Sequence, residues 1–275
     1  MDPGGREGFA PARGSGRQAL THLTLAEALG LTAGDVVALV GGGGKSTAMF
    51  RLAREIVTTG GRAITTTTTR IFGAQIALSP VHVPAADTTR QRVAEALSAH
   101  GQVLVIGPTD PGSGKAEGVS PALFEQLRAW FPGVSILNEA DGSRMRPFKA
   151  PAAHEPVIPV STTLVVPVVG ADVLGKTLDD DHVHRPELIS ALSGTSLGAR
   201  ITPEIVARVL RHRDGGCKGV PPGARVVAVI NKVESLADRA PAYETAKRLL
   251  EEPAIDAVVL AAVRAPEPVI EVCTR

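Results

Sequence analysis

The chain has 275 residues, of which 44% are hydrophobic and 21% are charged, enough for one large α/β domain or two small ones. Its net charge of +1 gives no reason to expect nucleic acid or a membrane surface as the main partner. Its two cysteines, Cys217 and Cys273, are too few for a disulfide framework or a cysteine-based zinc site.

The first segment, residues 1–18, is rich in Gly, Arg and Pro and offers little to bury, so we expect a disordered tail. No run approaches eighteen apolar residues, and the N-terminus lacks an apolar signal core. We therefore expect a cytoplasmic protein.

After the tail, short apolar runs alternate with amphipathic stretches. Strands are predicted over Val36–Val40, Arg62–Thr66, Gln102–Ile106, Val134–Asn138, Thr163–Val169, Arg225–Ile230 and Ala257–Ala262. Helices are predicted over Thr47–Thr58, Thr88–Ala99, Pro121–Phe131, Thr202–Leu210 and Ala242–Glu251. This alternation predicts a three-layer αβα fold with a mostly parallel sheet, whose ligands lie beyond the carboxyl ends of the strands.

The stretch "VVALVGGGGKSTAMF" places four glycines and Lys-Ser-Thr between the first strand and the first helix. It fits G-x-x-G-K-[ST], a phosphate-binding loop two residues shorter than the usual pattern. Glycines let backbone N–H groups surround phosphate oxygens, Lys45 would reach the β- and γ-phosphates, and Ser46 would bind Mg²⁺. A glycine-rich turn without ligand is the less favoured interpretation. The residues expected to bind the nucleotide here are Gly41, Gly42, Gly43, Gly44, Lys45, Ser46 and Thr47.

The second strand ends in "TTTTTR", Thr65 to Arg70. Strand propensity explains the first threonines, whereas Thr67 and Thr68 would lie at the ligand-facing rim as substrate-binding hydroxyls. Arg70 would neutralise charge on a transferring phosphoryl group. The alternative is an ordinary threonine-rich strand end.

Two acids follow the strand in "VSILNEADGS". Asp141 is the first choice for the carboxylate that binds Mg²⁺, directly or through water. Glu139 would share the metal or act as a base toward a nucleophile. The alternative is a pair of solvated acids in a turn.

Beyond Asp141, the chain cannot form a regular helix, because Gly142 and several prolines interrupt it. This stiff loop carries Arg144, Arg146 and Lys149 and suits an anionic second substrate, for example a phosphorylated pterin. The alternative is a solvated loop whose cations pair with nearby acids.

The stretch "DDDHVHRPE" contains His182 and His184, which could ligate a transition metal beside carboxylates. A more economical role is a gate over the nucleotide, with His184 or Arg185 near the γ-phosphate. Cys217 is interpreted as a loop residue rather than a nucleophile.

The strand in "VVAVINKVES" ends in Asn231, Lys232 and, two residues later, Glu234. This resembles the guanine-reading N-K-x-D element of GTPases, with Glu in the place of Asp. The choice between ATP and GTP stays open, with a slight preference for GTP.

Together, "VGGGGKST", "TTTTTR", "EADGSRMRPFKAPAAHEPVIP", "GKTLDDDHVHRPE", "HRDGGCKGVPPGAR" and "VINKVE" resemble the YqeC-type family over nearly all of the chain after the tail. The resemblance implies a P-loop NTPase-like domain over residues 19–275 and an accessory role in the maturation of selenium-dependent molybdenum hydroxylases. Carried over by position, it highlights Gly41–Ser46, Thr67–Arg70, Glu139, Asp141, Arg144, Lys149, His154, Glu155 and His184–Glu187.

Three hypotheses follow. The first is an NTP-hydrolysing accessory protein, in which Lys45, Ser46, Asp141 and Arg70 act on ATP or GTP with Mg²⁺. The second is a small-molecule kinase or ligase with Glu139 or His154 as base and Arg144 and Lys149 as the acceptor clamp. The third is a nucleotide-gated carrier of a metal or selenium species, with His182, His184 and Cys217 as ligands.

Overall fold

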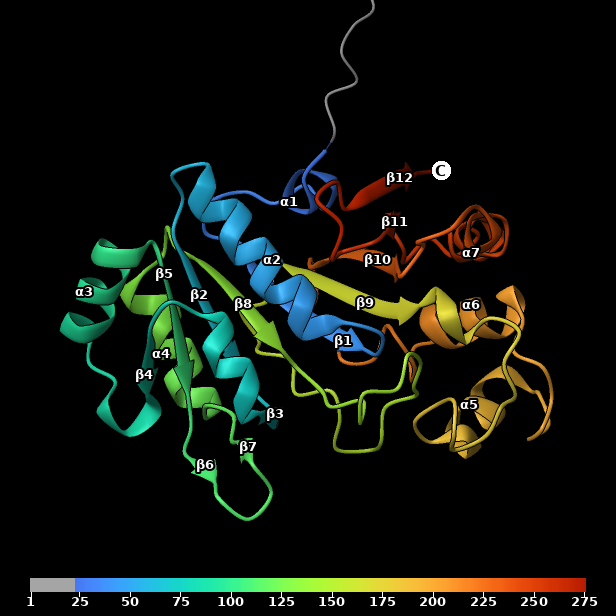
Figure 1. Ribbon diagram of the computed structural model, residues 1–275, viewed down its shortest axis with the longest axis horizontal. Coiled ribbons are helices and arrows are strands. Elements are labelled where there is room, and N and C mark those ends of the chain that lie inside the picture. The colour runs from blue at the N-terminus through green and yellow to red at the C-terminus, as the bar shows by residue number, and fades with distance from the viewer. Residues whose placement is uncertain (1–22) are drawn as a thin grey trace, which may run out of the picture.

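The computed structural model describes residues 23–275, so the tail expected over residues 1–18 lies outside the described residues. Nine strands form one sheet in the order β12-β11-β10-β9-β1-β8-β2-β5-β4 (Figure 1). Their bounds are β1 Val36–Gly41, β2 Ala63–Thr67, β4 His82–Pro84, β5 Gln102–Ile106, β8 Ser135–Glu139, β9 Leu164–Gly170, β10 Arg225–Asn231, β11 Ala257–Ala261 and β12 Val269–Cys273. Neighbouring strands pair in parallel except β12, which pairs antiparallel with β11.

Helices cover both faces of this sheet. Their bounds are α1 Leu25–Ala28, α2 Lys45–Thr58, α3 Arg90–His100, α4 Pro121–Trp130, α5 Pro186–Ser193, α6 Pro203–Arg211 and α7 Leu236–Leu249. Because side chains alternate along a strand, Val37 packs with α1 and α2 on one face, while Val36 packs with α3 and α4 on the other. Helices α6 and α7 pack against β9, β10 and β11 on that second face. The three-layer αβα arrangement predicted from the sequence is confirmed.

A small antiparallel sheet lies beyond the end of β2. It consists of β3 Ile71–Phe72, β7 Lys115–Ala116 and β6 Thr109–Asp110, in that order. Three short 3-10 helices complete the described elements: η1 Gly73–Leu78, η2 Ala85–Asp87 and η3 Ala171–Val173. Because it lies beyond the carboxyl end of β2, the small sheet adds a wall at the edge of the main sheet where ligands are expected.

Most of the predicted elements are present with ends shifted by one or two residues. Ser120 and Thr202 cap α4 and α6, since their side chains accept hydrogen bonds from the N–H groups of Leu123 and Ile205. Strands β4 and β12 and helices α1 and α5 were not predicted. Helix α7 begins six residues before the predicted Ala242, at Leu236. Within residues 23–275, no helix is both long and apolar enough to cross a bilayer.

Candidate functional site

The loop between β1 and α2 turns on positions that only glycine can occupy. Gly43 has a φ of 81°, and a Cβ there would lie 2.2 Å from the backbone nitrogen of Gly170. Gly44 has a φ of 123°, and its Cβ would lie 2.5 Å from the side-chain nitrogen of Asn231. The loop is therefore packed directly against the carboxyl ends of β9 and β10, and a side chain would force these strands apart.

The first three glycines use their N–H groups inside the protein. Gly41 donates to both carboxylate oxygens of Asp141 at 3.0 and 3.1 Å, Gly42 to the carbonyl of Val168 at 2.9 Å, and Gly43 to the carbonyl of Arg146 at 3.2 Å. The N–H groups of the first turn of α2 have no acceptor within the helix. An anion at this loop would therefore be held by the start of α2, where the helix dipole also favours negative charge.

Lys45 lies at this start and is only 3% exposed. Its ammonium donates to the carbonyl of Gly41 at 2.6 Å and lies 3.3 Å from Asp141 and 3.6 Å from Glu139. Burial opposes the charged form, but the two carboxylates outweigh it and raise the pKa of Lys45 above its ordinary value. The lysine is thus held as a cation beside the glycine turn.

Glu139, the last residue of β8, is joined directly to the loop. Its carboxylate accepts a 2.5 Å hydrogen bond from the hydroxyl of Ser46. Burial raises the pKa of Glu139, although Lys45 and Ser46 partly counteract the rise. A hydroxyl and a carboxylate oxygen in contact at the start of α2 are the hard oxygen donors that Mg²⁺ prefers, so this pair fits the cation.

Asp141 belongs to a buried chain of ion pairs that runs away from the loop. Its carboxylate lies 3.0 Å from the ammonium of Lys149. That ammonium lies 2.7 Å from the carboxylate of Glu155, and the same carboxylate lies 2.6 Å from the guanidinium of Arg185. Burial opposes the ionisation of Glu155, but hydrogen bonds from Arg185 and Lys149 prevail and lower its pKa to about 2. This chain fixes the loop after β8 to the start of α5.

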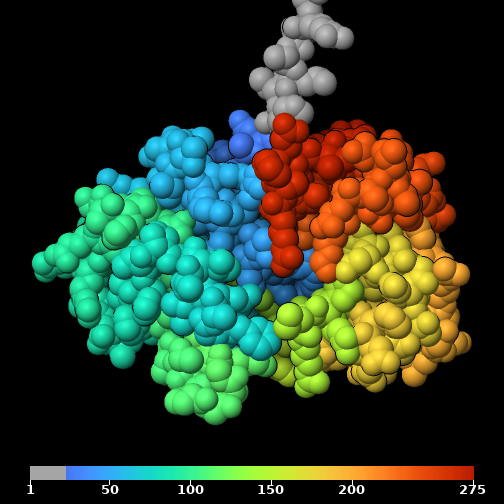
Figure 2. Space-filling model, viewed as in Figure 1, coloured from blue at the N-terminus to red at the C-terminus, as the bar shows by residue number. Residues whose placement is uncertain are grey.

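These elements enclose a cavity of about 390 Å³ at the carboxyl edge of the sheet, which we call the P-loop cavity. Glu139 and Glu155 are its acidic lining residues. The basic side chains lining it are Lys45, Arg70, Lys115, Arg144, His184, Arg185, Lys232 and Arg264. In Figure 2, the yellow-green segment after β8 lies on the surface between the green segments that precede it and the yellow segment leading to α5.

Unusual backbone conformation is concentrated around the P-loop cavity. Among residues 23–275, the non-glycine residues with positive φ are Arg144, Met145, Arg185 and Lys232, with values of 49° to 64°. All of them line the P-loop cavity. Each such residue costs roughly 1–3 kcal/mol, so the surrounding structure must hold these conformations in place.

Many of the residues singled out from the sequence line this cavity. They are Gly43, Gly44, Lys45, Ser46, Thr47, Arg70, Glu139, Arg144, His184, Arg185 and Lys232. Arg70 is 63% exposed and lies 3.4 Å from Glu117, an exposed pair that leaves the guanidinium accessible.

Other predicted residues support the cavity from behind. Thr67 donates to the carbonyl of Glu139 at 2.7 Å, and Thr68 to that of Val157 at 2.6 Å. Asn231 donates to the carbonyl of Gly43 at 2.7 Å and accepts from the N–H of Val263 at 3.0 Å, so it braces the loop. The predicted residues that do not line the cavity include Gly41, Gly42, Thr67, Thr68, Asp141, Arg146, Lys149, His154, Asn231 and Glu234.

Among the lining residues that the sequence analysis did not single out are two basic ones, Lys115 and Arg264. Arg264 follows β11, and the rule that ligands lie beyond strand carboxyl ends could have identified it. Lys115 reaches the cavity from the small sheet, where its ammonium lies 5.2 Å from the centre of the Phe72 ring. No local pattern marks that sheet in the sequence.

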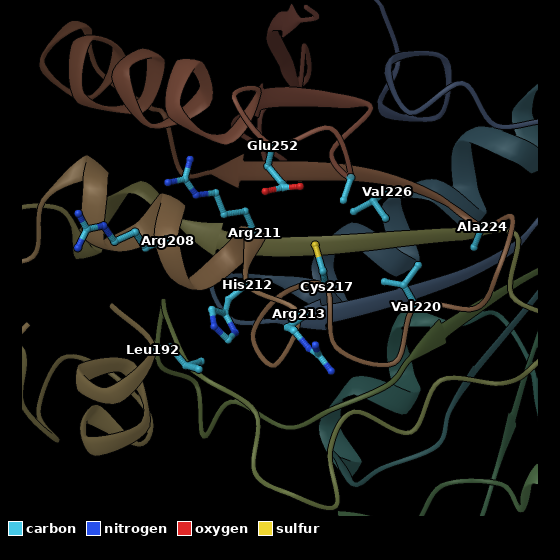
Figure 3. Close-up of a pocket in the computed structure, with 11 residues that line it drawn as sticks. Leu192, Arg208, Arg211, His212, Arg213, Cys217, Val220, Ala224, Val226 and Glu252 are labelled. Atoms are coloured by element: carbon cyan, nitrogen blue, oxygen red, sulfur yellow. The ribbon is translucent and has the colours of Figure 1, made fainter. Parts of the chain in front are cut away.

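A second cavity, of about 700 Å³, lies at the opposite edge of the sheet, beside the start of β10 (Figure 3). Cys217 lines it, and burial raises the pKa of this thiol to about 11, which makes it a poor nucleophile. His184 lines the P-loop cavity instead, and His182 pairs with Asp179 at 2.7 Å. The structure therefore does not bring together the three ligands considered for a metal carrier.

Comparison with known proteins agrees with the sequence resemblance. A sequence model of the YqeC family, described as YqeC protein, matches residues 37–187. A protein of Escherichia coli (strain K12), described as "Uncharacterized protein YqeC", is 32% identical over 198 residues, which cover 72% of this chain and 75% of the relative. The matched region includes the loop, both acids and the ion-pair chain described above, and the chain belongs to the YqeC family.

Proposed function

We propose that this YqeC-family protein binds a nucleoside triphosphate with Mg²⁺ in the P-loop cavity and hydrolyses it. The observation that carries the proposal is the contact between Ser46 and Glu139 beside the charged Lys45, at the start of a helix that follows a buried strand. This combination supplies N–H donors, a cation and oxygen ligands for a metal within one turn.

Each residue has a distinct part in this proposal. Lys45 and the first turn of α2 bind the phosphates, and Arg70 compensates charge near the terminal phosphate. Ser46 and Glu139 would hold Mg²⁺, which supplies the positive charge that a triphosphate requires. Asp141 is better placed as a positioning residue, because it binds the Gly41 N–H and two buried ammonium groups and does not line the cavity.

The base of the nucleotide is left open by these contacts. Asn231 and Lys232 lie beside the loop, as the resemblance to the guanine-reading element requires. Glu234 is exposed and does not line the cavity, so its carboxylate does not strengthen the preference for GTP. We therefore propose ATP or GTP.

The biological role is proposed from the family. The resemblance implies an accessory protein for the maturation of a molybdenum hydroxylase, working in the cytoplasm with that enzyme or with its cofactor-maturation machinery. Nucleotide binding and hydrolysis would provide the energy or the timing for one step of that process.

A second candidate function is a small-molecule kinase or ligase, which is favoured by the surplus of basic side chains in the cavity. The two functions are separated by phosphate release from ATP and GTP with purified protein and Mg²⁺. We expect steady release without any acceptor, and Glu139→Gln should abolish it. Strict dependence on an added acceptor would favour the second function, and no nucleotide binding at all would overturn both.

A further inference from the structure

We infer that the P-loop cavity contains a second anion subsite, formed by Arg144, His184 and Arg185, for a small ligand that carries its own phosphate or carboxylate group. This inference rests on the proposed function, because it places that ligand beside a nucleotide bound at Lys45.

The first argument is the charge of the cavity. The carboxylate of Glu155 pairs with Lys149 and Arg185, and that of Glu139 with Ser46 and Lys45. Within residues 23–275, Arg144 has no ion-pair or hydrogen-bond partner through its side chain, although it lines the cavity. Arg144 is exposed, and Arg185 uses one terminal nitrogen for Glu155 and for the carbonyl of Ala150, so both guanidinium groups keep N–H donors for an anion that enters the cavity.

The second argument is how the three residues are held together. His184 donates its backbone N–H to the carbonyl of Phe148 at 2.9 Å, which joins the segment before α5 to the loop after β8. Arg144 and Arg185 each have positive φ, at 49° and 64°. Strained backbone of this kind persists where a site requires it, and here it presents two guanidinium groups to one cavity.

The third argument is the charge state of the His184 imidazole. Burial and the charges of Arg185, Lys149 and Arg144 outweigh the carboxylate of Glu155 and lower the pKa of His184 to about 4. At neutral pH the ring is therefore uncharged, with one nitrogen able to donate and the other to accept a hydrogen bond. A bound anion would raise this pKa, which gives a signal independent of turnover.

The occupant is identified by its charge and not by its remaining structure. Guanidinium groups bind carboxylates and phosphates in the same paired manner, so the shared chemistry is an oxyanion. Two probes separate the sources: inorganic phosphate represents a phosphate ester, and succinate represents a carboxylic acid.

The test starts from protein saturated with Mg²⁺ and a non-hydrolysable triphosphate, so that the phosphate positions at Lys45 are filled. Each probe is titrated calorimetrically, and the imidazole of His184 is followed by NMR. We expect one probe or both to bind and to raise the pKa of His184. Arg144→Ala should weaken that binding about tenfold, the loss expected for one charged hydrogen-bond partner, while nucleotide affinity is unchanged within about threefold.

Matched variants make the result specific. Arg144→Lys should restore part of the affinity, and Arg213→Ala, which removes an exposed arginine at the other edge of the sheet, should have no effect. Absence of binding by both probes, or equal binding by wild type and Arg144→Ala, would overturn the subsite. If the triphosphate itself does not bind, the proposed function fails, and titration of the free protein still tests whether anion binding depends on Arg144.

Discussion

Replacing Asp141 with Asn should destabilise the fold more than replacing Glu139 with Gln. Asp141 is 1% exposed, and its carboxylate lies 3.3 Å from the ammonium of Lys45 and 3.0 Å from that of Lys149. An amide keeps the shape and one acceptor for the Gly41 N–H, but it leaves two buried cations with one fewer anion.

The expected size follows from these contacts. Removing one member of a buried ion pair costs about 3–5 kcal/mol, a large part of the 5–15 kcal/mol that stabilises a typical protein. The melting temperature should therefore fall by on the order of 10 °C. Glu139→Gln should cost less, because burial already raises the pKa of Glu139 and its nearest cation is 3.6 Å away.

Urea denaturation of wild type and both variants, without nucleotide, measures the free energies of unfolding. The same proteins are then titrated with nucleotide at several Mg²⁺ concentrations, where Glu139→Gln should lose Mg²⁺ dependence. An Asp141→Asn variant that is as stable as wild type but no longer responds to Mg²⁺ would refute this reasoning and make Asp141 the metal ligand.

Three further predictions concern the loop, the ion-pair chain and the base. Gly43→Ala should destabilise the protein by more than about 1 kcal/mol and weaken nucleotide binding. The control is Gly60→Ala, where φ is a similar 83° but nothing lies within 4 Å of the added Cβ, so stability should fall without any loss of binding. Equal losses of binding in the two variants would contradict the packing argument. The pKa of Glu155 is about 2 in the folded protein against an ordinary 4.5, so the stabilisation by its carboxylate is complete above about pH 5 and is lost as the pH falls toward 2. The free energy of unfolding should therefore fall less steeply with acid in Glu155→Gln than in wild type. An unchanged slope would count against the ion-pair chain. Because Glu234 is exposed and outside the cavity, Glu234→Gln should leave the ratio of GTP to ATP affinity unchanged within about twofold in competition binding. If this variant instead lost a preference for GTP, Glu234 would have the guanine-reading role.

The parts of the fold that sequence reasoning identified are those with a local cause. Apolar runs specify the central strands, and Ser120 with Pro121 specifies where α4 begins. Strand β4 is only three residues long, and β12 is partly exposed, so neither has a continuous apolar run. Helix α7 begins at Leu236, where Ser235 and Asp238 form a capping box, and it continues through Pro241. A proline inside a sequence pattern usually marks a helix end, and here the cap sets the helix start instead.

The candidate site also contains features with a local cause in the sequence and features without one. The glycines, Lys45 and Ser46 are consecutive in the sequence, so their association with a phosphate site could be predicted. The different surroundings of Glu139 and Asp141 could not, because these depend on which backbone N–H and which lysines lie beside each carboxylate after β1 and β8 pair in parallel. Lys149 looked like an acceptor ligand in sequence, but the fold buries it between Asp141 and Glu155.

The central claim is that the P-loop cavity binds a nucleoside triphosphate through Lys45, and calorimetric titration with Mg²⁺ and ATP or GTP tests it most directly. Lys247→Ala, which removes an exposed lysine in the last turn of α7, serves as the matched control, and circular dichroism verifies that each variant is folded. We predict saturable binding by wild type and Lys247→Ala and at least about a tenfold loss in Lys45→Ala, since a charged partner of the phosphates is removed. Equal affinity in folded Lys45→Ala, or no binding of either nucleotide by wild type, would contradict the claim.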